Sequence, residues 1–190
     1  MRSATVAAVL LLGVGAYVAV KSGAIQAASV GEGVSDLADG VSETVSQYLG
    51  VDMGSSRYAA ALQDPAYADI IAILSAAEAR YGIPSGLLVR QAWQESRFNP
   101  QAVSPAGAKG LMQFMSATAA EWGVDVGSVE SSADGAGRYM QWLYGRLGSW
   151  SLALAAYNWG IGNVLRKGLG AAPVETRNYV AQIGGELGLA

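Results

Sequence analysis

The chain has 190 residues, which is enough for one domain of typical size with an additional segment. Hydrophobic residues make up 52% of it and charged residues 14%, a mixture too apolar for a disordered chain. It contains no Cys and no His, so acid and base chemistry must come from carboxylates, Lys or Tyr, and we expect no metal site and no cofactor. The net charge of −3 argues against a nucleic-acid partner, because binding to phosphates needs a basic surface.

An apolar segment opens the chain. The run from Ala4 to Val20 contains no charged residue and lies between Arg2 and Lys21. Its length is at the short end of what spans a membrane, which predicts an anchoring helix within residues 1–24. A cleavable signal peptide is the main alternative, because Ser22-Gly23-Ala24 resembles a cleavage site, and a buried core helix is the third. The anchor is favoured because the apolar run exceeds that of a usual signal peptide.

Residues 25–56 are predicted to form a linker or stalk. From Gly31 to Ser56 the chain is rich in Gly, Ser and acidic residues, yet apolar residues recur at steps of three and four. They are Val34, Leu37, Val41, Val45 and Tyr48. This spacing predicts an amphipathic helix. A flexible spacer is an equal alternative, because Gly33 and Gly40 weaken a helix.

Residues 57–190 are predicted to form an all-α domain. Asp64-Pro65 is a typical helix start, and the helix that it opens can run to Tyr81 before Gly82 ends it. Further helices are expected at residues 84–98, 116–122, 131–147, 150–157 and 173–183. No turn of the Asn-Gly type separates alternating apolar runs, so no β-hairpin is expected.

Glu95 is the candidate catalytic residue of this domain. On a helical wheel it falls on the apolar face, between Leu87 and Leu88. Burial makes an ionised carboxyl group costly, so its pKa should rise and the group can hold a proton near neutral pH, as a general acid must. A structural role is the alternative, in which Glu95 pairs with an Arg or caps a neighbouring helix.

Three blocks of sequence resemble a known family. The first runs through Gln94-Glu95-Ser96-Arg97-Phe98-Asn99-Pro100, Ala102-Val103-Ser104 and Gly107-Ala108-Lys109-Gly110-Leu111-Met112-Gln113; the second is Ala155-Ala156-Tyr157-Asn158-Trp159-Gly160, and the third spans Pro173 to Val180. In order and spacing they closely resemble the catalytic segments of the lytic transglycosylases of the soluble, SLT-domain type. The resemblance covers about residues 70–183.

The resemblance implies a lysozyme-like helical fold of the goose-type lysozyme superfamily, with a groove for peptidoglycan glycan strands. Glu95 would lie at its floor as the single catalytic acid and base. The residues implied to bind substrate are Ser104, Gln113, Met115, Tyr157 and Asn158.

Physical roles can be attached to some of these residues. The Tyr157 hydroxyl can hydrogen-bond Glu95, and the Asn158 amide can hold an N-acetyl carbonyl. Helix-end packing and capping is the alternative for both. Gly107 and Gly110 would let the backbone approach a bulky sugar.

The chain departs from the family pattern in a few places. Ser116 stands where the family commonly has Pro, and it is an acceptable helix N-cap. Trp159 and Ile161 replace smaller residues, which leaves the subsite preference open. Residues 124–137 match the family poorly and receive no role.

One carboxylate suffices for the implied reaction. Glu95 would protonate the glycosidic oxygen and then take the proton of the muramoyl C6 hydroxyl, which attacks its own C1 to form a 1,6-anhydromuramic end. A lysozyme-like hydrolase is the close alternative, with Asp125 or Asp134 positioning water. A non-catalytic peptidoglycan-binding or structural protein is the alternative from another class.

The expected partners are peptidoglycan strands and, through the N-terminal helix, a membrane. The catalytic domain is expected to face the periplasm and cell wall, or to work from a virion membrane, and secretion after signal cleavage is the alternative. The same organisation fits a cellular enzyme, a component of a secretion apparatus and a virion protein.

Overall fold

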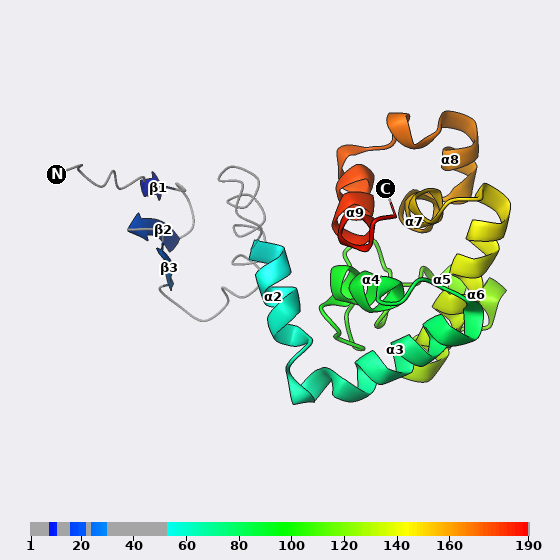
Figure 1. Ribbon diagram of the computed structural model, residues 1–190, viewed down its shortest axis with the longest axis horizontal. Helices are drawn as coiled ribbons and strands as arrows, with labels where there is room; N and C mark the ends of the chain where they lie inside the picture. The colour runs from blue at the N-terminus through cyan, green and yellow to red at the C-terminus, as the bar shows by residue number, and fades with distance from the viewer. Residues whose placement is uncertain (1–7, 11–15, 22–23, 30–52, 190) are drawn as a thin grey trace. The chain divides into compact units, whose positions relative to one another are not determined.

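The computed structural model describes residues 8–10, 16–21, 24–29 and 53–189 (Figure 1). The chain divides into two compact units, Met1–Arg57 and Tyr58–Ala190. Each unit is described by itself below.

The first unit contains a three-stranded antiparallel sheet in the order β1 (Ala8–Leu10), β2 (Ala16–Lys21) and β3 (Ala24–Ser29). Val9 of β1 pairs with Val18 of β2, and Lys21 at the end of β2 pairs with Ala24 at the start of β3.

This sheet corrects the prediction of one continuous helix from Ala4 to Val20. Residues 8–10 and 16–20 of that run are strands, while residues 4–7 and 11–15 lie outside the described residues. The physical reason is the β-branched residues in the strands, such as Val18, Val20 and Ile25, which suit a pleated strand better than a helix. No helix in the described chain is long and apolar enough to cross a membrane. Of the linker or stalk predicted at residues 25–56, residues 25–29 lie in β3 and residues 53–56 lie in a helix, while residues 30–52 are outside the described residues.

The second unit is helical, as the sequence predicts. In chain order the helical elements from residue 53 onward are α2 (Met53–Ala61), η1 (Pro65–Tyr67), α3 (Ala68–Tyr81), α4 (Leu87–Ser96), α5 (Ser116–Trp122), α6 (Val129–Leu147), α7 (Trp150–Trp159), α8 (Ile161–Lys167), η2 (Leu169–Ala171), α9 (Val174–Gly184) and η3 (Gly185–Leu187). Strand pairing between residues 53 and 189 is confined to two isolated bridges, which join Val103 to Lys109 and Lys109 to Phe114.

Local capping defines both ends of the first long helix of this unit. The Asp64 carboxylate accepts the backbone N–H of Ala66 at 2.9 Å, which opens η1 and leads into α3. At the other end Gly82 takes the left-handed conformation with φ of 63°, and its N–H closes on the carbonyl of Glu78. Both ends lie where the sequence signals predict them.

Helix α4 is shorter than predicted. It begins after Gly86, whose φ of 86° favours glycine, instead of at Pro84. It ends at Ser96, because Arg97 and Phe98 both have left-handed backbones, with φ of 53° and 61°. The chain therefore turns sharply directly after Glu95.

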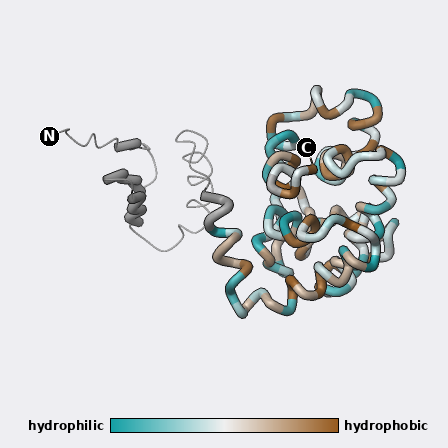
Figure 2. Tube along the Cα trace, in the orientation of Figure 1, coloured by the Kyte–Doolittle hydropathy of each residue, from teal (hydrophilic) through white to brown (hydrophobic). Residues whose placement is uncertain are grey.

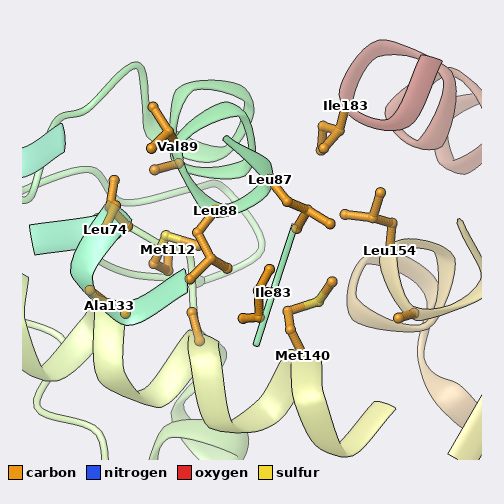
Figure 3. Close-up of a cluster of buried hydrophobic side chains, with 14 of the residues drawn as sticks. Leu74, Ile83, Leu87, Leu88, Val89, Met112, Ala133, Met140, Leu154 and Ile183 are labelled. Atoms are coloured by element: carbon orange, nitrogen blue, oxygen red, sulfur yellow. The ribbon is translucent and has the colours of Figure 1, made fainter. Parts of the chain in front are cut away.

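The core of the second unit joins α3, α4, α6, α7 and α9. Helix α3 packs along α6, while α7 packs against α6, α8 and α9, and α4 contacts α3, α6 and α9 (Figure 1). Figure 2 shows apolar and polar residues alternating along these helices, as expected for elements that bury one face. In Figure 3, Leu87 of α4 meets Leu154 of α7 near Ile183 of α9, and all three are buried. The helix that carries Glu95 is thus fixed by the core on several sides.

Candidate active site

Glu95 lies in the last turn of α4, next to the sharp turn at Arg97 and Phe98. The neighbouring Ser96 hydroxyl donates to the Leu111 carbonyl oxygen at 2.8 Å, which ties the helix end to the following loop. Phe98 is 1% exposed and packs against Trp93, with ring centroids 5.4 Å apart. Glu95 is therefore held on a rigid support, as a catalytic group needs to be.

The Tyr179 hydroxyl of α9 donates a hydrogen bond to Glu95 Oε1 at 2.5 Å. Burial raises the pKa of Glu95 from its ordinary value of 4.5 to about 7; the Tyr179 hydrogen bond acts in the opposite direction, and the charge of Glu175 raises it further. The raised pKa agrees with the prediction from the apolar helix face. The residue as a whole is nevertheless partly exposed.

Two of these groups are absent from the residues predicted to form the site. Tyr179 lies in the third sequence block, whose Tyr is part of the pattern, so a signal for it was present. Glu175 lies in the same block, in the first turn of α9, and it is the acidic residue whose charge acts on Glu95. It was missed because the sequence gives no indication that α9 lies beside the end of α4.

Tyr157 does not make the hydrogen bond that was expected. Its hydroxyl donates to the Met112 carbonyl oxygen at 2.8 Å, and a phenol has one proton to donate. Tyr179 therefore takes the role assigned to Tyr157. Tyr157 still lies close to the site, because the charge of Glu95 contributes, after burial, to the strong rise in the pKa of Tyr157.

Asn158 is exposed at the end of α7, and its Oδ1 accepts the hydroxyl proton of Thr176 at 2.7 Å. Thr176 is 2% exposed, so this bond joins α7 to α9. With Oδ1 engaged, the amide NH₂ is the end of Asn158 that can donate to a ligand carbonyl. The arrangement supports a structural role for Asn158 and is compatible with the predicted binding role.

Gln113 and Ser104 shape the loop between α4 and α5. Gln113 has a left-handed backbone, with φ of 48°, and its Nε2 donates to the carbonyl oxygens of Gly110 at 2.9 Å and Ala102 at 3.2 Å. The Ser104 hydroxyl accepts the N–H of Ala108 at 3.0 Å. Both predicted binding residues therefore use polar atoms to hold the loop.

The two loop glycines play different parts. At Gly110, with φ of 77°, a Cβ atom would lie 2.3 Å from the Val126 carbonyl oxygen, so its lack of a side chain serves internal packing. This corrects the expectation that Gly110 makes room for a sugar. At Gly107, with φ of 87°, a Cβ atom would meet no atom within 4 Å among the described residues, so that glycine faces open space.

Met115 is 48% exposed and precedes α5 at its N-cap position, and Ser116 is the first helical residue. Ser116 is thus not the N-cap that the sequence suggested. Trp159, at the end of α7, is partly buried, and the Lys167 ammonium lies 5.4 Å from its ring centroid. The indole ring of Trp159 therefore lies close to the Lys167 ammonium group.

The two acids considered as partners for Glu95 are engaged in local structure. Asp134 accepts from Tyr81 at 2.6 Å, pairs with Arg80 and Arg138 at 3.0 Å each, and its pKa is lowered chiefly by the Tyr81 hydrogen bond. Asp125 accepts the N–H of Gly127 at 2.9 Å in a turn. Asp134, which lies within the residues 124–137 that received no role, thus connects α6 to α3. No group of acidic residues in the described chain is arranged to hold a metal ion.

Comparison with protein families identifies a family for the helical unit. Residues 72–180 match the family described as "Transglycosylase SLT domain", which is more than half of the chain. The match includes the helix with Glu95, the loop through Gln113, and the blocks with Tyr157 and Tyr179.

Curated relatives share the same region. Over 100 residues the chain is 40% identical to "Membrane-bound lytic murein transglycosylase F" of Saccharophagus degradans, covering 48% of this chain and 20% of the relative. Over 88 residues it is 43% identical to the protein of the same name from Yersinia enterocolitica, covering 42% of this chain and 18% of the relative. The chain spans about a fifth of the length of these relatives.

Solved structures give the same picture of the fold. An inactive mutant of the lytic transglycosylase Slt from Pseudomonas aeruginosa has a TM-score of 0.50 and 27% identity, covering 59% of this chain and 22% of that one. The 70 kDa soluble lytic transglycosylase from Escherichia coli has a TM-score of 0.50 and 29% identity, covering 58% of this chain and 22% of that one. The helical unit therefore has the lysozyme-like fold that the sequence resemblance implied.

Proposed function

Because this chain belongs to the Transglycosylase SLT domain family, we propose that it is a lytic transglycosylase that cleaves the β-1,4 bond between N-acetylmuramic acid and N-acetylglucosamine in peptidoglycan. The observation that carries the proposal is the state of Glu95. Its carboxyl group is desolvated, held by Tyr179 at 2.5 Å and has a pKa of about 7. This is the environment that a general acid requires.

The proposed reaction uses Glu95 twice. The protonated carboxyl group donates its proton to the glycosidic oxygen as the bond from that oxygen to the muramoyl C1 breaks. The resulting carboxylate takes the proton of the muramoyl C6 hydroxyl, whose oxygen forms the new bond to C1. Glu95 ends as the acid in which it began, the product has a 1,6-anhydromuramic end, and no water is consumed.

The intramolecular attack explains how one carboxylate is enough. The C6 hydroxyl belongs to the same sugar as C1, so it has a high effective concentration and needs no second protein group to position it. A pKa near 7 also suits both halves of the cycle, because the acid and the carboxylate are both accessible at neutral pH.

Hydrolysis of the same bond is the second candidate function, and Glu175 is the observation that favours it. This exposed acid is close enough for its charge to raise the pKa of Glu95, and a second carboxylate is what hydrolytic glycosidases use to direct water. The acids first considered for this task, Asp125 and Asp134, are bound in a turn and in a salt-bridge cluster.

Mass spectrometry of digested peptidoglycan tests the proposal. Incubation of purified sacculi with the protein is expected to release muropeptides that end in 1,6-anhydromuramic acid. Products with reducing muramic ends would identify a hydrolase instead. Sacculi that stay intact with folded protein would point to a non-catalytic binding protein.

For the location, we propose that the catalytic unit works on the cell-wall side of the cytoplasmic membrane, because its proposed substrate lies there. Cell fractionation, with protease added to intact spheroplasts, tests this location. Protection of the protein from that protease would contradict it. Attachment to a membrane and membership of a virion or secretion apparatus stay predictions from the sequence.

A further inference from the structure

Gln91 is a polar residue in an apolar place. It lies on α4 among core residues and is 0% exposed, and its neighbour Ala92 is equally buried. Among the described residues, neither Nε2 nor Oε1 of its amide has a hydrogen-bond partner of good geometry. An amide that is buried without partners lowers stability, so its presence suggests a role other than packing.

The position of Gln91 relates it to the catalytic group. It precedes Glu95 by four residues on the same helix, so the two side chains share one face. Helix α9 packs against α4, and Tyr179 reaches from α9 to Glu95 Oε1 at 2.5 Å. Tyr179 is 5% exposed and Gln91 is 0% exposed, so both side chains are shielded from water.

The titration behaviour of Tyr179 agrees with this placement. Burial, the charge of Glu95 and the hydrogen bond to Glu95 raise its pKa well above the ordinary value, while the Gln91 side chain acts to lower it. This influence agrees with the position of Gln91 one helical turn before Glu95, on the helix that packs against α9.

We propose that Gln91 is a positioning residue of the active site: its amide NH₂ donates to the Tyr179 oxygen and so directs the phenol proton toward Glu95 Oε1. This inference rests on the proposed function for its catalytic meaning. Gln91 touches no substrate, because it is fully buried.

The chemical consequence concerns which carboxyl oxygen carries the catalytic proton. A phenol oxygen that accepts a hydrogen bond from Gln91 keeps its own proton for Glu95. Glu95 Oε1 then remains an acceptor, so the proton of the acid form resides on Oε2. An acid whose proton is fixed on one oxygen meets the glycosidic oxygen in a single orientation.

The other titratable groups near Glu95 stay in place when Gln91 is changed. They are Glu175 and Tyr179 on α9 and Tyr157 on α7, of which Glu175 raises the pKa of Glu95 by its charge and Tyr179 lowers it by its hydrogen bond. A loss of Gln91 therefore weakens the one contact that lowers the pKa of Glu95. The expected shift in the Glu95 pKa is upward.

The test is a double-mutant cycle on the full chain with Gln91→Leu, Tyr179→Phe and both together. Two quantities are measured: steady-state cleavage of peptidoglycan, and the pKa of Glu95 by carboxyl ¹³C NMR. Gln91→Leu is expected to lower kcat roughly tenfold with KM unchanged, and to raise the Glu95 pKa. In the Tyr179→Phe background, Gln91→Leu is expected to change neither quantity further.

Control variants separate this role from a structural one. Ser132→Ala removes another buried side chain whose hydroxyl has no partner among the described residues, and it is expected to leave kcat and the Glu95 pKa unchanged. Gln91→Met is a second variant, of similar volume to Gln, in case Leu disturbs the fold. It is expected to behave as Gln91→Leu does.

Two results would overturn the inference. One is an unchanged kcat and an unchanged Glu95 pKa in a folded Gln91→Leu or Gln91→Met protein. The other is an effect of equal size with and without the Tyr179 hydroxyl, which would mean that Gln91 acts through general packing. Failure of the proposed function can be told apart from failure of this inference. In the first case the wild-type protein cleaves no peptidoglycan, while the NMR titration still measures the effect of Gln91 on the Glu95 pKa.

Discussion

At the scale of single residues, the site depends on a carboxyl group that the fold keeps away from water. Burial raises the pKa of Glu95, and one short hydrogen bond from Tyr179 limits the rise. The carboxylate form of Glu95 is therefore higher in free energy than it would be in water, but it is still populated near neutral pH. A group in this state is poor for stability and well suited to proton transfer.

Replacement of Glu95 by Gln tests whether the buried carboxyl group lowers stability and whether it transfers the catalytic proton. Glu95→Gln keeps the shape of the side chain and removes the transferable proton, so cleavage is expected to fall by at least a hundredfold. At pH 8 the variant is also expected to be at least as stable as the wild type, because it has no buried charge. Activity assays and urea unfolding at pH 8 measure the two effects.

The sign of the stability change follows from the pKa values. The pKa of Glu95 is about 7 in the fold and about 4.5 in the unfolded chain, so between these values the native state binds more protons. Stability from this group is therefore fully present below pH 4.5 and lost as the pH rises to 7.

A Glu95→Gln protein that retains normal turnover would refute the catalytic assignment.

Activity is expected to depend on pH through the same group. The acid form of Glu95 protonates the leaving oxygen, so kcat/KM should fall as the pH rises through about 7, approaching tenfold for each further unit. Initial rates on soluble glycan fragments, measured from pH 5 to 9 with circular dichroism to monitor folding, provide the profile. A rate that stays constant across this range in folded protein would contradict the assignment.

The sequence located the acid but not the tyrosine that binds it. Periodicity places the carboxyl group of Glu95 on the apolar face of its helix, and the family resemblance selects it as the catalytic candidate. The choice between Tyr157 and Tyr179 depends on where α7 and α9 lie relative to the end of α4. That is a property of tertiary packing, and the same reason explains why Glu175 was missed.

At the scale of elements, helix α4 depends on an acid from another helix. Glu78 of α3 is 2% exposed, and its carboxylate accepts the backbone N–H groups of Gly86, Leu88 and Val89 at 2.8, 2.7 and 3.1 Å. These are donors at the N-terminus of α4 that no preceding turn can satisfy. Burial raises the pKa of Glu78, and the three hydrogen bonds act against that rise.

Removal of this cap is expected to destabilise the unit that carries the site. Glu78→Ala leaves three N–H groups, two of them buried, without their acceptor and should lower the free energy of unfolding by about 2–4 kcal/mol. Glu121→Gln, at an exposed position of α5, is the matched control and should stay within about 0.5 kcal/mol. Urea unfolding of the two variants measures this difference. An equal effect of both changes would show that the cap contributes little.

The capping signals Asp64 and Gly82 mark helix ends that the structure reproduces. Ser116 does not, because it lies inside α5 after the N-cap Met115. The short helix α8 was missed, because Gly160 and Gly162 weaken a helical pattern that packing against α7 restores. Residues 8–10 and 16–20 of the N-terminal apolar run were wrongly taken as helical, since a continuous apolar segment fits a strand equally well.

At the scale of the whole molecule, α2 limits where the helical unit can be separated from the residues before it. The division at Arg57 and Tyr58 falls inside α2, which runs from Met53 to Ala61. Tyr58 is 7% exposed, its ring lies 6.2 Å from that of Trp93, and the Arg90 guanidinium lies 4.5 Å from its centroid. Trp93 and Arg90 belong to α4, so α2 supports the helix that carries Glu95.

Truncation at two points tests this dependence. A protein that begins at Met53 keeps α2, so it is expected to fold and to cleave isolated peptidoglycan as the full chain does. A protein that begins at Leu62 loses the buried Tyr58 and its ring contacts, and its free energy of unfolding should be lower by about 2–4 kcal/mol. Thermal unfolding and cleavage assays compare the two. If the Met53 protein fails to fold, or if both truncations are equally stable, α2 does not have the supporting role assigned to it.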